Sequence, residues 1–146
     1  AYKGIPLASS VAMAFAEADQ DYPLSFNRKE VKTHGEGGLL LGAPLMGQIL
    51  AIDDVVTAGT AVRESFKFIA NHGATLSSFC VAVDRQERGQ EGSGCALSEL
   101  ADIFNLIPIS IVNLDDILAF TSDDPRFASD VASRIDEYRS QYGALI

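Results

Sequence analysis

Three short apolar runs, separated by two stretches with helical periodicity, constrain the fold of this chain more than any other feature. The apolar runs cover residues 48–52, 76–83 and 107–112. Residues 60–72 and 95–104 place their apolar side chains at the spacing of one helical face. Strand, helix, strand, helix, strand is the order that builds a parallel sheet with flanking helices. We therefore expect an α/β fold.

The segments on either side of this unit are less regular. Residues 4–18 are rich in alanine and have helical spacing, which predicts a helix. Residues 27–38 mix charged residues and glycines and show neither helical nor strand periodicity, which predicts a loop. Asp124 and Pro125 are predicted to open a final helix, with proline in its first turn. The apolar stripe of that helix would consist of Phe127, Val131, Ile135 and Tyr138.

Composition limits the function classes. A chain of 146 residues with 47% hydrophobic content suits one domain over residues 1–146. Its net charge of −9 argues against general affinity for nucleic acid or anionic membranes. No apolar run reaches the roughly 18 to 20 residues that span a bilayer, and no leader sequence is recognisable. We expect a cytoplasmic protein with no nucleic-acid or membrane partner.

Cysteine usage agrees with a reducing compartment. Cys80 and Cys95 are too few for a disulfide scaffold or a structural zinc site. Cys80 lies within an apolar run, so we expect it to be a buried core thiol.

The segment over residues 49–61, ILAIDDVVTAGTA, is the most informative for chemistry. A buried strand delivers Asp53 and Asp54 at its carboxyl end, where open α/β sheets bind their ligands. The turn over residues 57–60 then leads into a helix, and its backbone N–H groups suit a phosphate. Neighbouring side chains of a strand point to opposite sides, so the two aspartates suit two neighbouring hydroxyl groups.

A simpler interpretation of this segment is that Thr57 and Thr60 cap the helix and the aspartates are solvated. Against it, two carboxylates at a buried strand end cost desolvation free energy unless they are used. Neither G-x-G-x-x-G nor G-x-x-x-x-G-K-[ST] occurs in the chain, so the phosphate is not expected to belong to NAD or ATP.

Three further segments carry charges suited to anions. Three fixed cations lie between residues 28 and 34, and three glycines follow at once. This pattern predicts a mobile lid over about residues 29–42 that binds an anion. The alternative is a solvated charged loop without a ligand. Arg85 follows a strand in DRQERG and suits a substrate carboxylate, or belongs to a charged surface turn. The opening AYKGIP places Lys3 before a helix and is weak evidence alone.

The string over residues 49–61 resembles the phosphoribosyl pyrophosphate (PRPP) signature of type I phosphoribosyltransferases. The resemblance implies their Rossmann-like fold, a mainly parallel sheet with flanking helices. It also implies that Asp53 and Asp54 hold the ribose hydroxyls of PRPP while the following turn holds its 5′-phosphate. The PRPP-binding residues implied in this string are Asp53, Asp54, Val55, Val56, Thr57, Ala58, Gly59, Thr60 and Ala61.

The lid sequence R-K-x-x-K-x-H-G resembles orotate phosphoribosyltransferases in particular, as do DRQERG and AYKG. The resemblance implies that Arg85 and Thr57 contact orotate. It also implies three catalytic residues: Lys32, which acts on the departing pyrophosphate, and Asp53 and Asp54, which act on the ribose. In that family the lid lies over the pyrophosphate of PRPP, partly from the neighbouring subunit of a dimer. The pyrophosphate contacts implied are Tyr2, Lys3, Arg28, Lys29, Lys32 and His34.

The implied reaction joins orotate and PRPP into orotidine 5′-monophosphate and pyrophosphate, in de novo UMP biosynthesis. The implied cofactor is Mg²⁺, carried mainly by the pyrophosphate without a protein metal site, and the implied assembly is a homodimer with shared active sites. The alternatives are another PRPP-dependent base phosphoribosyltransferase and a non-catalytic PRPP-sensing regulator. Because the family extends upstream of AYKG, we expect N-terminal elements of the domain to be missing here.

Overall fold

The computed structural model describes residues 3–32, 38–57, 59–92, 94–124, 126–127 and 130–144. At residues 29–32, 38 and 123 it describes the backbone alone.

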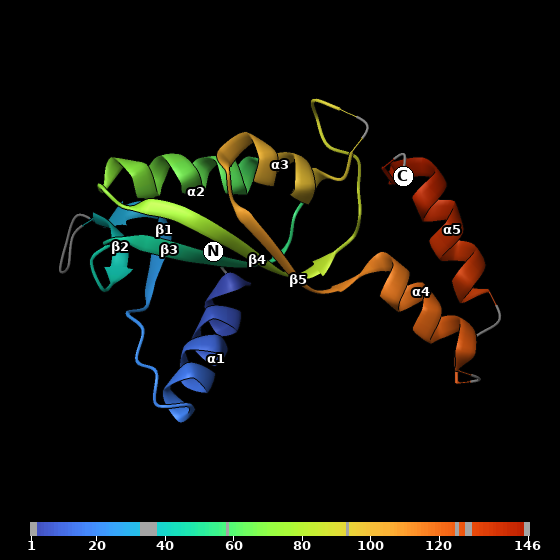
Figure 1. Cartoon of the computed structure of the whole chain (residues 1–146), viewed down its shortest axis with the longest axis horizontal. Coiled ribbons are helices and arrows are strands. Elements are labelled where there is room, and N and C mark those ends of the chain that lie inside the picture. Colours follow the sequence, from blue (N-terminus) through green and yellow to red (C-terminus); the bar gives the residue numbers. More distant parts are fainter. Residues whose placement is uncertain are drawn as a thin grey trace.

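The centre of the molecule is a three-stranded parallel sheet in the order β3-β4-β5 (Figure 1). Its strands are β3 (Gln48–Val55), β4 (Thr75–Asp84) and β5 (Ile107–Asn113). All three strands run in one direction, so their carboxyl ends form a common edge. The predicted α/β sheet is confirmed. We call this common edge the carboxyl edge of the sheet.

Helices α2 (Thr60–Asn71) and α3 (Ala96–Phe104) lie on one face of this sheet, and α1 (Gly4–Glu17) lies on the other (Figure 1). The buried core lies under α2 and α3, where Val62 and Leu100 pack with Phe79 and Val81 of β4. Among the described residues, no helix has the length and apolar content that a membrane crossing requires.

Strand β3 is longer than the apolar run predicts. Parallel pairing continues through Asp53 opposite Val81 and Val55 opposite Val83. The aspartates are therefore the last part of the strand rather than residues that follow it. Backbone hydrogen bonding to β4 extends the strand beyond the residues whose side chains are apolar.

The loop predicted over residues 27–38 is wrong for its described part. Strand β1 (Ser25–Lys32) pairs antiparallel with β2 (Gly38–Gly42), with an irregular register between Asn27 and Lys32. Neither strand alternates polar and apolar side chains, because this two-stranded ribbon lies apart from the core sheet (Figure 1). Of the predicted lid, only residues 33–37 lie outside the described backbone.

The C-terminal region also departs from the prediction. A helix over α4 (Leu114–Asp123) was not predicted, and it ends where Asp124 and Pro125 were expected to open one. The last helix, α5 (Val131–Tyr142), begins seven residues after Asp124, and Phe127 precedes it, packing edge-on against Phe120 of α4. The missed signal is Asn113 three positions before Asp116, which forms a capping box at the start of α4.

The face of the sheet opposite α2 and α3 is only partly covered. Ile107, Ile109 and Ile111 alternate along β5, share this face, and are 63%, 41% and 71% exposed. Cys80 pairs with Ile109 in the register and is half-buried, so the expectation of a buried core thiol is wrong. The reason is that this face of β4 lacks a full helical cover.

Candidate substrate-binding site

The carboxyl edge of the sheet gathers residues from three separate parts of the sequence. Asp53 and Asp54 lie near the end of β3, and Arg85 directly follows the end of the neighbouring β4. The first turn of α1 approaches the same edge, because the backbone of Gly4 lies against β3. Segments about 30 and 50 residues apart in sequence thus meet, as the crossover geometry of a parallel sheet requires.

Lys3 and Asp54 form the direct link between the AYKG element and the PRPP-like string. The Lys3 Nζ donates to Asp54 Oδ2 at 2.9 Å. Gly4 allows this approach, because a Cβ there would lie 2.9 Å from the Ile52 carbonyl oxygen and 3.5 Å from Asp53 Oδ1. A larger residue would push α1 away from the strand, so glycine is needed for close contact.

The two aspartates have different electrostatic environments. Burial raises the pKa of Asp53, whose Oδ1 accepts the Asp54 backbone N–H at 2.9 Å. The hydrogen bond from Lys3 lowers the pKa of Asp54. The two neighbouring side chains thus contact different groups, Asp53 the Asp54 backbone N–H and Asp54 the Lys3 ammonium, as expected for adjacent residues of a strand.

The turn between β3 and α2 uses glycine for conformation and for space. Gly59 is the N-cap of α2 with φ 75°, and a Cβ there would lie 2.8 Å from Leu100 Cδ1. No side chain caps α2 at this position, which argues against the simple capping interpretation of the turn. The first N–H groups of α2 therefore face the turn in which the resemblance places the 5′-phosphate.

Arg85 stands beside these residues with its own carboxylate partner. Its Nη2 lies 2.9 Å from Glu87 Oε1, and the two side chains are 33% and 17% exposed. Its Nε is buried and has no hydrogen-bond partner among the described residues. The predicted charge cluster of DRQERG therefore contains a defined ion pair that leaves part of the guanidinium fork unused.

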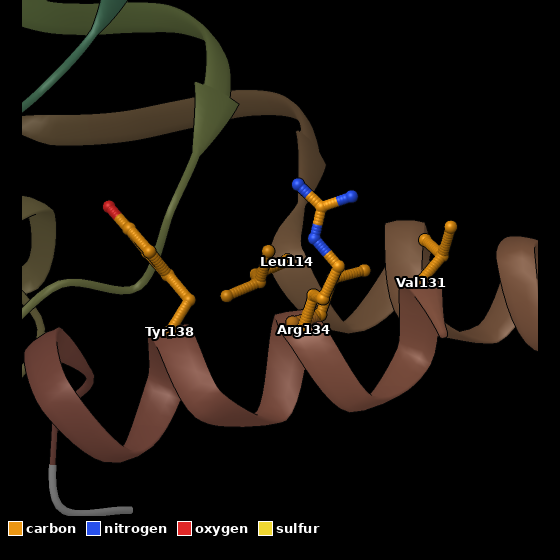
Figure 2. Close-up of a pocket in the computed structure, with 5 residues that line it drawn as sticks. Leu114, Val131, Arg134 and Tyr138 are labelled. Atoms are coloured by element: carbon orange, nitrogen blue, oxygen red, sulfur yellow. The ribbon is translucent and has the colours of Figure 1, made fainter.

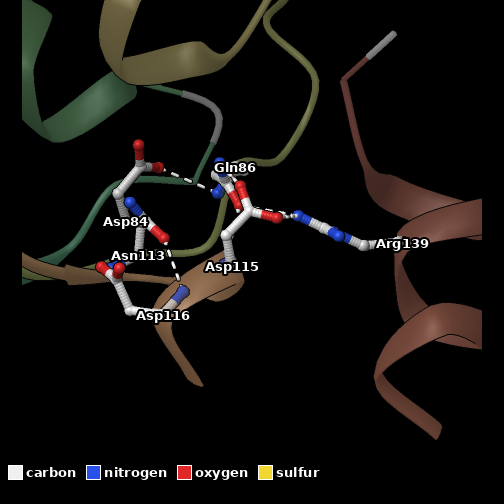
Figure 3. Close-up of polar contacts among 6 residues, drawn as sticks. All are labelled: Asp84, Gln86, Asn113, Asp115, Asp116 and Arg139. Carbon is white, nitrogen blue, oxygen red and sulfur yellow. Dashed lines mark hydrogen bonds and ion pairs between the residues drawn. The ribbon is translucent and has the colours of Figure 1, made fainter. Parts of the chain in front are cut away.

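Helices α4 and α5 hold the segment that carries Arg85. Gln86 donates to Asp115 at 2.7 Å, and Arg139 of α5 contacts both Asp115 and Gln86 (Figure 3). Asp84 accepts the Gln86 backbone N–H at 2.9 Å. Sequence reasoning missed this support, since it depends on Arg139, which lies 53 positions after Gln86.

The backbone of this segment is also held by the C-terminal end of α5. The Arg88 N–H donates to the Tyr142 carbonyl at 2.9 Å, and the Ala144 N–H donates to the Gln86 carbonyl at 3.0 Å.

The described strands of the predicted lid, β1 and β2, do not reach the carboxyl edge within this chain. Strand β2 ends at Gly42, six positions before β3 begins at Gln48, so the ribbon joins the opposite end of the sheet (Figure 1). Arg28 lies on β1 of this ribbon. Lys29 and Lys32 are described only in their backbone, and Tyr2, His34 and Ala58 lie outside the described residues.

A pocket of about 340 Å³ lies elsewhere, between α4 and α5 (Figure 2). Leu114, Val131, Arg134, Ile135 and Tyr138 line it, and it includes no predicted substrate residue. We regard the carboxyl edge as the better candidate site, because charged groups with distinct partners converge there. Among the described residues, no group of three or more His, Cys, Asp or Glu residues is arranged to hold a metal ion.

Known proteins are similar to this chain over nearly its whole length. The orotate phosphoribosyltransferase of Laribacter hongkongensis is 50% identical over 98% of this chain and 66% of its own length. That of Yersinia pestis is 46% identical over 100% of this chain and 67% of its own length. The chain belongs to the orotate phosphoribosyltransferase family. It is thereby a member of the pentosyltransferases of pyrimidine biosynthesis, as the sequence resemblance predicted.

The fold of the family is confirmed by a solved structure. The crystal structure of orotate phosphoribosyltransferase from Francisella tularensis matches 99% of this chain and 68% of its own, with a TM-score of 0.78 and 29% identity. No family model matches the chain. The chain spans about two thirds of the length of the curated relatives that it matches.

Proposed function

We propose that the protein transfers the phosphoribosyl group of PRPP to orotate, giving orotidine 5′-monophosphate and pyrophosphate. The observation that carries the proposal is the meeting of Lys3, Asp54 and Arg85 at one sheet edge. Lys3 and the β3–α2 turn offer cationic and N–H contacts for phosphates, and the aspartates offer acceptors for ribose hydroxyls. Arg85 offers a planar fork for the carboxylate of orotate.

The chemistry requires positioning and charge rather than a protein nucleophile. As pyrophosphate leaves, positive charge develops on the ribose carbon, and the Asp53 and Asp54 carboxylates stabilise it. Lys32 is assigned to the negative charge that develops on the leaving group. Tyr2, Lys3, Arg28, Lys29 and His34 are assigned to pyrophosphate binding, and Val55, Val56, Thr57, Ala58, Gly59, Thr60 and Ala61 to the sugar phosphate.

Magnesium fits this donor set as a partner of the substrate. Mg²⁺ prefers oxygen ligands and is commonly held by one or two carboxylates together with substrate phosphates, which suits Asp53 and Asp54 beside a pyrophosphate. When bound, Mg²⁺ neutralises part of the pyrophosphate charge. Asp54 keeps its hydrogen bond to Lys3, so the protein contribution to the metal is small.

A homodimer with shared active sites explains the position of the lid. The β1–β2 ribbon lies at the amino end of the core sheet, whereas Asp53 and Arg85 lie at its carboxyl edge (Figure 1). Several residues of β3 separate the two ends, and each adds about 3.3 Å along the strand. We assign the lid over residues 29–42 to the site of a second subunit. This arrangement places Lys32 of one copy over the Asp53 and Asp54 of the other.

The test is an assay of the full-length gene product with PRPP and Mg²⁺, following the loss of orotate by ultraviolet absorbance. Adenine, hypoxanthine and uracil are offered in parallel. We expect turnover with orotate alone among these bases. Turnover with a different base would assign the protein to another phosphoribosyltransferase activity, whereas PRPP binding without turnover would favour a PRPP-sensing regulator.

Arg85→Ala separates the two substrates. We expect the KM for orotate to rise at least about tenfold, because a charge-assisted hydrogen bond to the carboxylate is lost, while the KM for PRPP changes little. Arg88→Ala is the matched control in the same segment, since Arg88 Nη2 contacts the Gly143 carbonyl oxygen at 3.2 Å. Equal increases in both KM values for Arg85→Ala would contradict the assignment.

A further inference from the structure

The ion pair between Arg85 and Glu87 has a third member on the C-terminal helix. The Tyr138 hydroxyl of α5 donates to the same Glu87 Oε1 that contacts Arg85 Nη2. Figure 2 shows the Tyr138 ring projecting from α5 with its hydroxyl directed away from the helix. A single carboxylate oxygen thus joins the proposed orotate-binding side chain to a helix that contributes no residue to the assigned substrate contacts.

Glu87 is fixed in its backbone as well as in its side chain. Its backbone forms an isolated antiparallel bridge with Gly143, just after the end of α5. Its carbonyl accepts the Ala96 backbone N–H of α3 at 2.8 Å. With only 17% of the side chain exposed, Glu87 has little freedom to leave the guanidinium.

A carboxylate beside an anion-binding arginine has two opposing effects. It repels a bound carboxylate by charge, and it holds the arginine in one orientation. Hydrogen bonds from Tyr138 and Arg85 both spread the charge of Glu87, which reduces the repulsion. The Arg85 Nε is buried and has no partner among the described residues, so it is the exposed third of the Arg85 side chain that is open to a further acceptor.

We propose that Glu87 and Tyr138 are positioning residues that orient Arg85 toward the carboxylate of orotate. The proposal rests on the proposed function, since it assigns a support to the orotate-binding residue of that site. It gives α5 a role in substrate recognition: the helix sets the angle of the guanidinium through Tyr138 and Glu87. Burial and the Glu87 carboxylate raise the pKa of Tyr138, so its hydroxyl remains a donor at neutral pH.

The experiment compares Tyr138→Phe with the matched control Tyr142→Phe in the full-length protein. Tyr142 lies one helical turn further along α5, is 47% exposed, and packs its ring against that of Tyr138. We expect Tyr138→Phe to raise the KM for orotate about tenfold, with kcat and the KM for PRPP unchanged. Tyr142→Phe is expected to match the wild type.

A second pair of variants tests Glu87 by rescue. Glu87→Ala removes the oxygen that holds Arg85, whereas Glu87→Gln keeps an oxygen acceptor for Arg85 and Tyr138. We expect Glu87→Ala to raise the orotate KM about tenfold and Glu87→Gln to restore most of the loss. Orotate binding is also measured directly by calorimetry, which does not require turnover.

Two outcomes would overturn the proposal. One is an unchanged orotate KM and binding constant in Tyr138→Phe and Glu87→Ala, which would leave the contact as an anchor of α5. The other is an equal loss of affinity for orotate and for PRPP in these variants, together with a lower melting temperature. Absence of orotate turnover in the wild type would instead count against the proposed function, and the two failures are thereby distinguished.

Discussion

Gly59 is needed both for its positive φ and for the space beside Leu100, whereas Gly73 shares only the positive φ and so serves as a control. Both have positive φ, 75° and 77°, but only Gly59 has a close neighbour, because a Cβ at Gly73 meets no described atom within 4 Å. Alanine at Gly73 adds backbone strain of about 1 to 2 kcal/mol. Alanine at Gly59 adds overpacking against Leu100 of about 1 to 3 kcal/mol more.

We therefore predict that Gly59→Ala lowers the free energy of unfolding more than Gly73→Ala does, and that it alone raises the KM for PRPP. Denaturant unfolding and initial-rate kinetics on both variants provide the measurement. Equal losses of stability in the two variants would show that the contact with Leu100 does not constrain the turn.

The hydrogen bond from Lys3 makes a prediction about Asp54. Asp54 has a pKa below its ordinary value of 3.8, mainly because of this bond. A lowered folded-state pKa stabilises the fold above the unfolded pKa, and this stabilisation is lost as the pH falls through the folded value. Lys3→Met should raise the pKa of Asp54 toward 3.8 and remove that pH-dependent stabilisation.

Carboxyl resonances followed by NMR through an acid titration measure this effect. The Asp115 carboxyl serves as an internal control, because hydrogen bonds from Gln86 and Arg139 lower its pKa and Lys3→Met leaves both in place. An unchanged Asp54 titration in Lys3→Met would mean that the ion pair is absent in solution.

Among the elements, α4 is the one whose start is most clearly defined. The Asn113 side chain accepts the Asp116 N–H and the Asp116 side chain accepts the Asn113 N–H, both at 2.9 Å. Asn113→Ala should lower the free energy of unfolding by about 1 kcal/mol, because the Asp116 backbone N–H loses the Asn113 side chain as its acceptor.

Thr121→Ala is the control on the same helix, since the Thr121 hydroxyl bonds only to carbonyls of its own helix in the described contacts, at 2.9 Å for Ile117. It should change stability by less than about 0.5 kcal/mol. Chemical denaturation of both variants decides the comparison, and a loss of similar size in each would argue against the capping box.

Element types were predictable where the periodicity was strong. The three core strands and α1, α2 and α3 match the apolar patterns of the sequence. The β1–β2 ribbon did not show in the pattern, because its pairing depends on backbone hydrogen bonds between strands that lie apart from the core. Helix α4 was not predicted and the last helix was predicted to start too early, because the proline at position 125 is a strong local signal for a helix start, whereas the capping box of Asn113 and Asp116 is a weak one.

At the scale of the whole molecule, the proposal of shared active sites in a homodimer leads to a complementation prediction. Lys32→Ala alone should lower turnover by orders of magnitude with modest loss of PRPP affinity. A double variant, Asp53→Asn with Asp54→Asn, should also be inactive. In a random mixture, half of the dimers would contain one intact site of two, so about a quarter of wild-type activity should return.

The measurement is orotate turnover before and after the two variants are mixed, with differently tagged subunits to demonstrate heterodimers. Lys32→Ala mixed with itself under two tags is the control. No recovery in demonstrated heterodimers would place the lid and the aspartates of one site on the same subunit.

By itself the sequence determined the parallel α/β core, the residues of the PRPP-like string and the family, because apolar periodicity and short motifs are local properties of the chain. Only the tertiary structure decided which distant residues meet: Lys3 with Asp54, and Arg85 with Glu87 and Tyr138. Those contacts depend on strand register and on how helices pack on the sheet. Both arise from long-range hydrogen bonding and close packing, which no single segment specifies.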